Sequence, residues 1–161
     1  MFTLGEIIDL AIRIEKNGEK VYRRAQKEVS DPTLSSMLQW LADDELEHEK
    51  WFMQFKNGGD KTAEDPKLEE MANAILGGVL GEQAFSLQDT DFTTIESVQN
   101  LLGLSIEFEK DTVLFYEMLS AFVEDEQTLS QLKKIIEEEN RHVQMLQDYI
   151  EGREVLPFKA K

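Results

Sequence analysis

Residues 38–52 read LQWLADDELEHEKWF, and residues 132–146 read LKKIIEEENRHVQML. Each stretch starts with a leucine, has a glutamate seven positions later and a histidine three positions after that. The chain of 161 residues holds only these two histidines. Residues three apart project from the same face of a helix, so each Glu-x-x-His pair can reach one centre. The pairs are Glu45 with His48 and Glu139 with His142.

The two stretches belong to a longer internal repeat with a fixed offset of 94 residues. The same offset relates Glu15 to Glu109, which lie in the matching motifs IEK-x5-Y and FEK-x5-Y. A duplicated helical hairpin explains this repeat better than coincidence does. Further pairs at this offset are Lys16 and Lys110, Tyr22 and Tyr116, Asp31 and Asp125, and Leu38 and Leu132.

Apolar residues at steps of three and four predict four amphipathic helices, with the repeated glutamates and histidines inside the apolar stripes. Short breaks at Asp31 and Asp125 join the helices of each hairpin, which are therefore antiparallel. No segment shows the alternation that predicts a strand. The expected fold is all-α, an antiparallel four-helix bundle with one long crossover between two duplicated hairpins.

The breaks also set the predicted boundaries. We expect one bundle domain over residues 1–152, with hairpins at 3–57 and 94–151, a crossover at 58–93 and a tail at 153–161. Within the crossover, residues 67–80 predict a helix that glycines weaken. Residues 93–96 read TTIE, which resembles the capping box that opens a helix.

Composition excludes several classes of function. The net charge of −16 disfavours nucleic acid and anionic membranes as partners and favours cations. The chain contains no cysteine, so it has no disulfide framework, no Cys-ligated iron centre and no cysteine nucleophile. Charged residues interrupt the N-terminal apolar pattern, unlike a signal peptide. We expect a soluble, cytoplasmic protein.

Six ionisable side chains in the predicted core point to a metal centre. An unpaired buried carboxylate costs about several kcal/mol, and four together also repel one another. Two divalent cations would neutralise four carboxylates. Oxygen-rich ligation with one imidazole per ion suits iron, with manganese or a mixed pair as alternatives, and suits zinc less well. The expected ligands are Glu15, Glu45, His48, Glu109, Glu139 and His142.

Other residues could support this centre from outside it. We expect Asp44 to orient His142 and Glu138 to orient His48, because metal-bound imidazoles usually donate their second N–H to a carboxylate. Tyr22 and Tyr116 lie seven residues after Glu15 and Glu109 and could bond a ligand carboxylate, donate an electron or simply pack. Glu19 could be an additional ligand, and Trp40 and Trp51 are expected to pack or to lie at the surface.

These motifs resemble the rubrerythrin branch of the ferritin-like di-iron carboxylate proteins, from about Leu4 to Ile150. The resemblance implies that Glu45 and Glu139 bridge two iron ions, with Glu15 and Glu109 as terminal ligands. It also implies an oxidoreductase active in oxidative stress, whose reduced centre reacts with hydrogen peroxide or dioxygen. The chain departs from rubrerythrins in lacking a Cys-rich rubredoxin domain, so the electron donor would be an external protein. Thr112 stands where rubrerythrins carry a further glutamate.

Three alternatives stay open at this point. The centre could serve a ferroxidase that binds or stores iron, as in ferritins, or it could stabilise an interaction bundle without turnover. A metal-free helical bundle is the third alternative. We expect a homodimer, which would not provide the hollow shell that iron storage needs.

Overall fold

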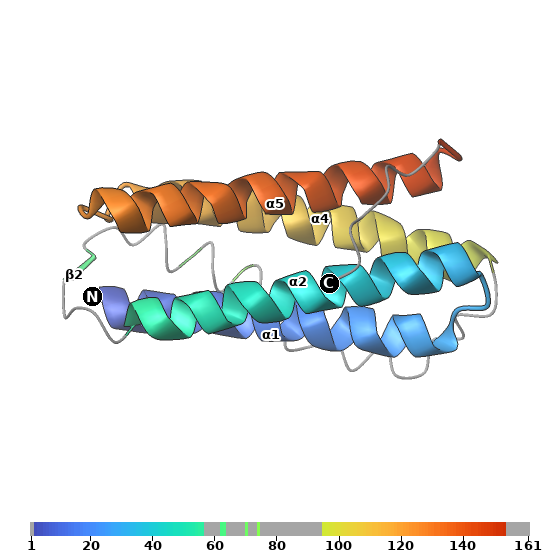
Figure 1. The fold of residues 1–161 in the computed structure, drawn as a ribbon, viewed down its shortest axis with the longest axis horizontal. Helices are drawn as coiled ribbons and strands as arrows, with labels where there is room; N and C mark the ends of the chain where they lie inside the picture. The colour runs from blue at the N-terminus through green and yellow to red at the C-terminus, as the bar shows by residue number, and fades with distance from the viewer. Residues whose placement is uncertain (1, 57–61, 64–69, 71–73, 75–94, 154–161) are drawn as a thin grey trace.

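The computed structural model describes residues 2–56, 62–63, 70, 74 and 95–153. Four long helices dominate this part: α1 (Leu4–Glu28), α2 (Pro32–Lys56), α4 (Ile95–Ser120) and α5 (Glu126–Ile150). Figure 1 shows α1 beside α2 and α4 beside α5, with all four helices running along the long axis. The predicted all-α bundle is therefore confirmed. Most of the predicted crossover helix, the two threonines of the TTIE cap before α4 and most of the tail lie outside the described residues.

The two hairpin turns are built alike, as the repeat predicts. Before α2, the Asp31 side chain accepts a hydrogen bond from the Thr33 backbone N–H at 3.1 Å. Before α5, the Asp125 side chain accepts hydrogen bonds from the backbone N–H and hydroxyl of Thr128 at 2.9 and 2.7 Å. Each aspartate satisfies a backbone donor that the first helical turn leaves free. The repeated aspartates thus fix where the second helix of each hairpin begins.

A short antiparallel pair lies before the first helix, where the sequence predicted no strand. β1 (Phe2–Thr3) pairs with β2 (Thr62–Ala63), so that Phe2 faces Ala63 and Thr3 faces Thr62. Two residues are too few to show the alternating pattern by which a strand is recognised in a sequence. The pair links the start of α1 to a point beyond α2 and leaves the bundle all-α.

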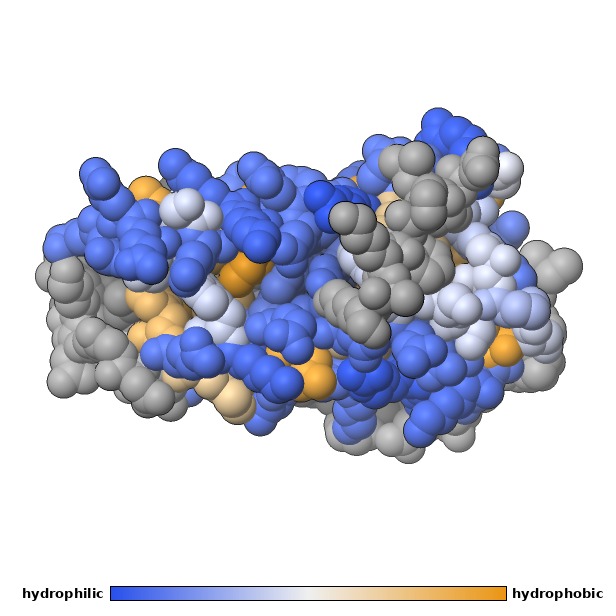
Figure 2. Space-filling view, in the orientation of Figure 1, coloured by the Kyte–Doolittle hydropathy of each residue, from blue (hydrophilic) through white to orange (hydrophobic). Residues whose placement is uncertain are grey.

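The predicted stripes form the core. Along α2, Leu34, Leu38, Leu41 and Phe52 are at most 1% exposed, and Glu45 and His48 of the same stripe are buried with them. In Figure 2 the visible face is mainly hydrophilic, with isolated hydrophobic residues. Among the described helices, none has an apolar stretch long enough to cross a membrane. The acidic exterior therefore surrounds a largely apolar interior in which most buried ionisable residues gather at one level.

Candidate metal centre

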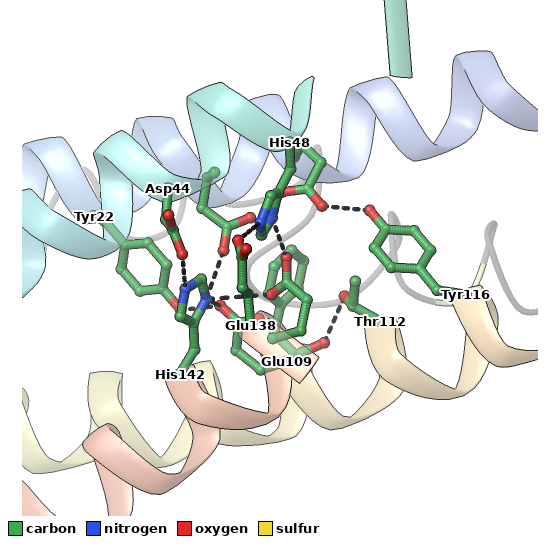
Figure 3. Close-up of polar contacts among 12 residues, drawn as sticks. Tyr22, Asp44, His48, Glu109, Thr112, Tyr116, Glu138 and His142 are labelled. Atoms are coloured by element: carbon green, nitrogen blue, oxygen red, sulfur yellow. Dashed lines mark hydrogen bonds and ion pairs between the residues drawn. The ribbon is translucent and has the colours of Figure 1, made fainter. Parts of the chain in front are cut away.

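All six predicted ligands meet at that level of the bundle. One glutamate comes from α1 and one from α4, and each Glu-x-x-His pair comes from α2 or α5 (Figure 3). Their side chains are almost fully buried, the most exposed being His48 at 3%. The stripes bring them together because each hairpin places its glutamate and its Glu-x-x-His pair at a similar distance from the turn. The six are Glu15, Glu45, His48, Glu109, Glu139 and His142.

Both imidazoles turn Nδ1 toward the carboxylates. His48 Nδ1 lies 2.6 Å from Glu139 Oε1 and 3.6 Å from Glu15 Oε2. His142 Nδ1 lies 3.1 Å from Glu45 Oε1 and 3.5 Å from Glu109 Oε1. The two rings are nearly parallel, with centroids 6.0 Å apart and planes 19° apart. Each histidine therefore offers the same nitrogen to the centre, as a duplicated hairpin requires.

The donor atoms form two overlapping groups, each spanning at most 4.8 Å. One group joins Glu15 and His48 to the pair Glu45 and Glu139. The other joins Glu109 and His142 to the same pair. Two adjacent cation positions that share two carboxylates are the arrangement expected of a bridged di-metal centre.

Two outer carboxylates hold the histidine rings. Asp44 Oδ2 lies 2.7 Å from His142 Nε2, and Glu138 Oε2 lies 2.7 Å from His48 Nε2. Each bond crosses between α2 and α5, so an acid of one hairpin orients the imidazole of the other. A carboxylate on Nε2 keeps Nδ1 directed at the centre. These are the two partners that the sequence predicts.

The two buried tyrosines also act across the hairpins. Tyr22 of α1 donates to Glu109 Oε1 at 2.7 Å, and Tyr116 of α4 donates to Glu15 Oε1 at 2.5 Å. Tyr116 bonds Oε1 of Glu15 and leaves Oε2, which lies 3.6 Å from His48 Nδ1. Tyr22 bonds Oε1 of Glu109, the oxygen that also lies 3.5 Å from His142 Nδ1. Of the alternatives for these tyrosines, the geometry favours bonding to a carboxylate.

The pKa values of the buried residues show that their charges are unfavourable without cations. Burial, followed by repulsion from Glu109 and Glu139, raises the pKa of Glu45 well above its usual range. Burial and the Glu139 charge likewise raise the pKa of Glu109 to about 8. Burial lowers the pKa of His48, but the charges of Glu15 and Glu139 outweigh it and raise that pKa well above the usual value. Burial and mutual repulsion thus favour the protonated forms of Glu45 and Glu109 unless cations balance their charges.

The residues fit a pair of metal ions. Four carboxylate oxygens and one ring nitrogen are buried in the centre without a well-formed hydrogen bond, although His142 Nδ1 and Glu45 Oε1 approach to 3.1 Å. Buried polar atoms in folded proteins normally form hydrogen bonds. A cluster of carboxylate oxygens and a ring nitrogen that lack them is therefore suited to coordinate metal ions. These atoms are Glu15 Oε2, Glu45 Oε1, Glu109 Oε2, Glu139 Oε2 and His142 Nδ1.

Comparison with known proteins agrees with this geometry. The family model for rubrerythrin matches residues 6–150. The chain belongs to the rubrerythrin family. A crystal structure from Thermotoga maritima, provisionally described as a ferritin-like diiron-carboxylate protein, superposes with a TM-score of 0.69 over 93% of this chain and 95% of that one. Its sequence identity is 20%, so it supports the fold. No curated protein matches significantly.

Two residues contact or make room for ligands of this rubrerythrin-family centre in ways that the sequence did not indicate. Trp40 meets the His142 ring edge-on, with centroids 5.6 Å apart. It lies four residues before Asp44, and that spacing could have placed it beside the centre. At Gly18, a Cβ atom would lie 3.1 Å from Glu45 Oε2, so the glycine makes room for a central carboxylate.

Three other residues that the sequence singled out belong to neither donor group of the centre. Glu19 is paired with Arg23 at 2.7 Å and belongs to neither donor group of the centre. Thr112 is buried, and its hydroxyl donates to the backbone oxygen of Phe108 at 2.8 Å. Trp51 lies among aromatic neighbours and donates to Gln131 at 2.6 Å.

Proposed function

We propose that this chain binds two iron ions between its hairpins and works as an oxidoreductase on hydrogen peroxide or dioxygen. One observation carries the proposal: two four-residue donor groups share Glu45 and Glu139 inside a buried, hydrogen-bond-deficient cluster. Membership of the rubrerythrin family supports it. Iron is favoured over zinc because the donors are mainly carboxylate oxygens.

The roles of the residues follow from their positions. Glu45 and Glu139 would contact both ions, while Glu15 with His48 and Glu109 with His142 would each complete one position. Asp44 and Glu138 hold the two imidazoles, and the tyrosine hydroxyls hold the outer glutamates. An iron pair held by these residues would, in its reduced form, supply the two electrons that O–O cleavage requires. Since these 161 residues lack cysteine, a Cys-ligated donor centre would lie outside them.

Metal content tests the site directly. The metal-free protein is loaded with ferrous iron without oxygen, desalted and analysed by plasma mass spectrometry. We expect about two ions per chain, the number that this ligand pattern holds in other bundles. Glu45→Ala and Glu139→Ala should each reduce the iron content sharply. Glu47→Ala and Glu137→Ala are matched controls, because these glutamates are exposed on the same helices. Full helicity with no bound iron would overturn the proposal.

Reactivity tests the oxidoreductase separately. The ferrous protein is mixed in a stopped-flow instrument with peroxide and, in parallel, with air-saturated buffer. Oxidation of the ferrous centre within seconds by peroxide or by dioxygen would support the proposed reaction, and the faster of the two would be the preferred oxidant. Two retained ions that neither oxidant attacks would leave a metal-stabilised bundle instead. A mass measurement adds the last distinction, since a large shell would indicate iron storage and a dimer would exclude it.

A further inference from the structure

The internal repeat makes two halves of the centre directly comparable, and they are not equally closed. On one side, Trp40 of α2 meets His142 edge-on at 5.6 Å. The residue at the matching place in the second hairpin is Lys134, 94 positions later. Lys134 is exposed, and its charge helps to lower the pKa of Glu138 after the larger effect of the His48 hydrogen bond. An indole thus covers one half where the other has a flexible charged chain.

The outer carboxylates differ in the same direction. The Asp44 side chain beside His142 is 8% exposed, whereas the Glu138 side chain beside His48 is 23% exposed. Both make the same 2.7 Å contact to an imidazole Nε2, so the difference is one of cover and not of bonding. Figure 3 shows each acid against its own histidine where α2 meets α5. The two acids are neighbours, because Asp44, Glu138 and His48 offer atoms within 4.8 Å of one another.

We infer that the two metal positions exchange with solvent at different rates. The position of Glu15 and His48 opens to solvent past Glu138 and Lys134, and the position of Glu109 and His142 is shielded by the half-buried indole of Trp40. This inference rests on the proposed metal centre and adds the route by which ions and small oxidants reach it. An ion, or a small oxidant, reaches the His48 side first.

The physical reason lies in how an ion leaves. A metal dissociates when water replaces its ligands one at a time, and water must reach the ligand being replaced. A hydrophobic shell around a site restricts that access. The lysine side chain keeps its charged end in water and can move aside, whereas an indole packed against the core and the His142 ring moves less readily.

Cobalt(II) release provides the test. Protein loaded with cobalt alone is mixed with excess EDTA, and the visible absorption of bound cobalt is followed. We expect two phases of equal amplitude, separated by about tenfold or more in rate, the scale of effects around metal ligands. Trp40→Ala should accelerate the slow phase and leave the fast phase unchanged. Lys134→Trp should slow the fast phase and leave the slow one unchanged.

Trp51→Phe is the control, since Trp51 stacks on Phe55 and contacts neither imidazole in the described contacts. It should leave both phases as they are. If Trp40→Ala does not fold, Lys134→Trp tests the inference alone, because an exposed position tolerates it. Two cobalt ions that leave at one rate in every variant would overturn the inference and spare the metal centre. Failure to bind two ions would overturn both.

Discussion

Tyr22 of α1 donates a hydrogen bond to Glu109 of α4, 2.7 Å away in the opposite hairpin. Tyr116 returns the same contact to Glu15, so two buried hydroxyls connect the hairpins at the level of the centre. Burial, followed by the charge of the accepting glutamate, raises the pKa of each tyrosine above its ordinary value, so both hydroxyls stay protonated as donors. The two tyrosine hydrogen bonds therefore position the expected metal ligands and also hold the two hairpins together.

Removing one hydroxyl should weaken the fold without emptying the centre. Tyr116→Phe leaves a buried Glu15 oxygen without its donor, which costs about 1–3 kcal/mol in the free energy of unfolding of the metal-free protein. Urea titration measures this loss. Iron content should stay near that of the unchanged protein, because Tyr116 lies outside both donor groups, while the oxidation rate should change. Equal stability and an equal rate in the variant would show that the hydroxyl only fills space.

The metal-free protein should lose stability as the pH rises. The pKa of Glu109 is raised from 4.5 to about 8 in the folded state, so between these values the folded chain holds a proton that the unfolded chain has released. The free energy of unfolding then falls with pH by up to about 1.4 kcal/mol per unit for each such group. His48 and His142 act in the same direction, because their raised pKa values give stability below their unfolded pKa that is lost above the folded one.

Urea unfolding between about pH 5 and pH 8 measures this slope, since the window lies between the two pKa values of such a group. The metal-loaded protein is the matched control. Protons compete with cations for the same ligands, so metal stabilisation should grow over the same range. A metal-free protein that is more stable at pH 8 than at pH 5 would contradict the assigned protonation of the cluster.

Gly18 should be required for iron binding and not for the stability of α1. A Cβ at this position would lie 3.1 Å from Glu45 Oε2 and 3.3 Å from its Cδ, closer than ordinary contact. Gly18→Ala should therefore lower iron affinity by about tenfold through displacement of a shared ligand. Gly103→Ala is the control, because nothing lies within 4 Å of its Cβ. That change should stabilise α4 by up to about 1 kcal/mol and leave iron binding unaltered.

Much of this architecture could be predicted because the spacing of residues along a helix determines which face of the helix they occupy. The stripes, the Asp31 and Asp125 turns and the approach of Asp44 to His142 all follow from residues that recur every three or four positions and every 94. Contacts that depend on side-chain direction between helices could not be predicted. The sequence placed the tyrosines near the glutamates without showing that each bonds the glutamate of the other hairpin.

Asymmetry was the other feature that the sequence concealed. A repeat directs attention to matching residues, whereas Trp40 and Lys134, or Gly18 and Thr112, matter because they do not match. The sequence suggested packing for Trp40 and a further ligand role for Glu19. The structure brings the first against an imidazole and turns the second to Arg23. Only the packed helices show which unmatched pairs face the centre.

The repeated turn aspartates should also differ in their contribution to stability. Asp125 accepts its two hydrogen bonds from Thr128 in the first turn of α5, so Asp125→Ala should lower the free energy of unfolding by about 1 kcal/mol, as for other helix caps. Asp31 caps α2 through Oδ1 and also accepts the hydroxyl hydrogen bond of Tyr149 through Oδ2. Asp31→Ala should therefore cost more, by about 0.5–1.5 kcal/mol for the second bond. Thermal or urea unfolding of the metal-free variants compares the two directly.

A double-mutant cycle with Tyr149→Phe isolates that difference. In the unchanged protein Tyr149→Phe should be destabilising, and in the Asp31→Ala background it should have almost no effect, since its partner is gone. Iron content should be the same in all variants, because the turn lies about 24 Å along α1 from Glu15. Tyr149→Phe effects that are equal in both backgrounds would mean that the bond joining α5 to the first turn does not contribute to stability.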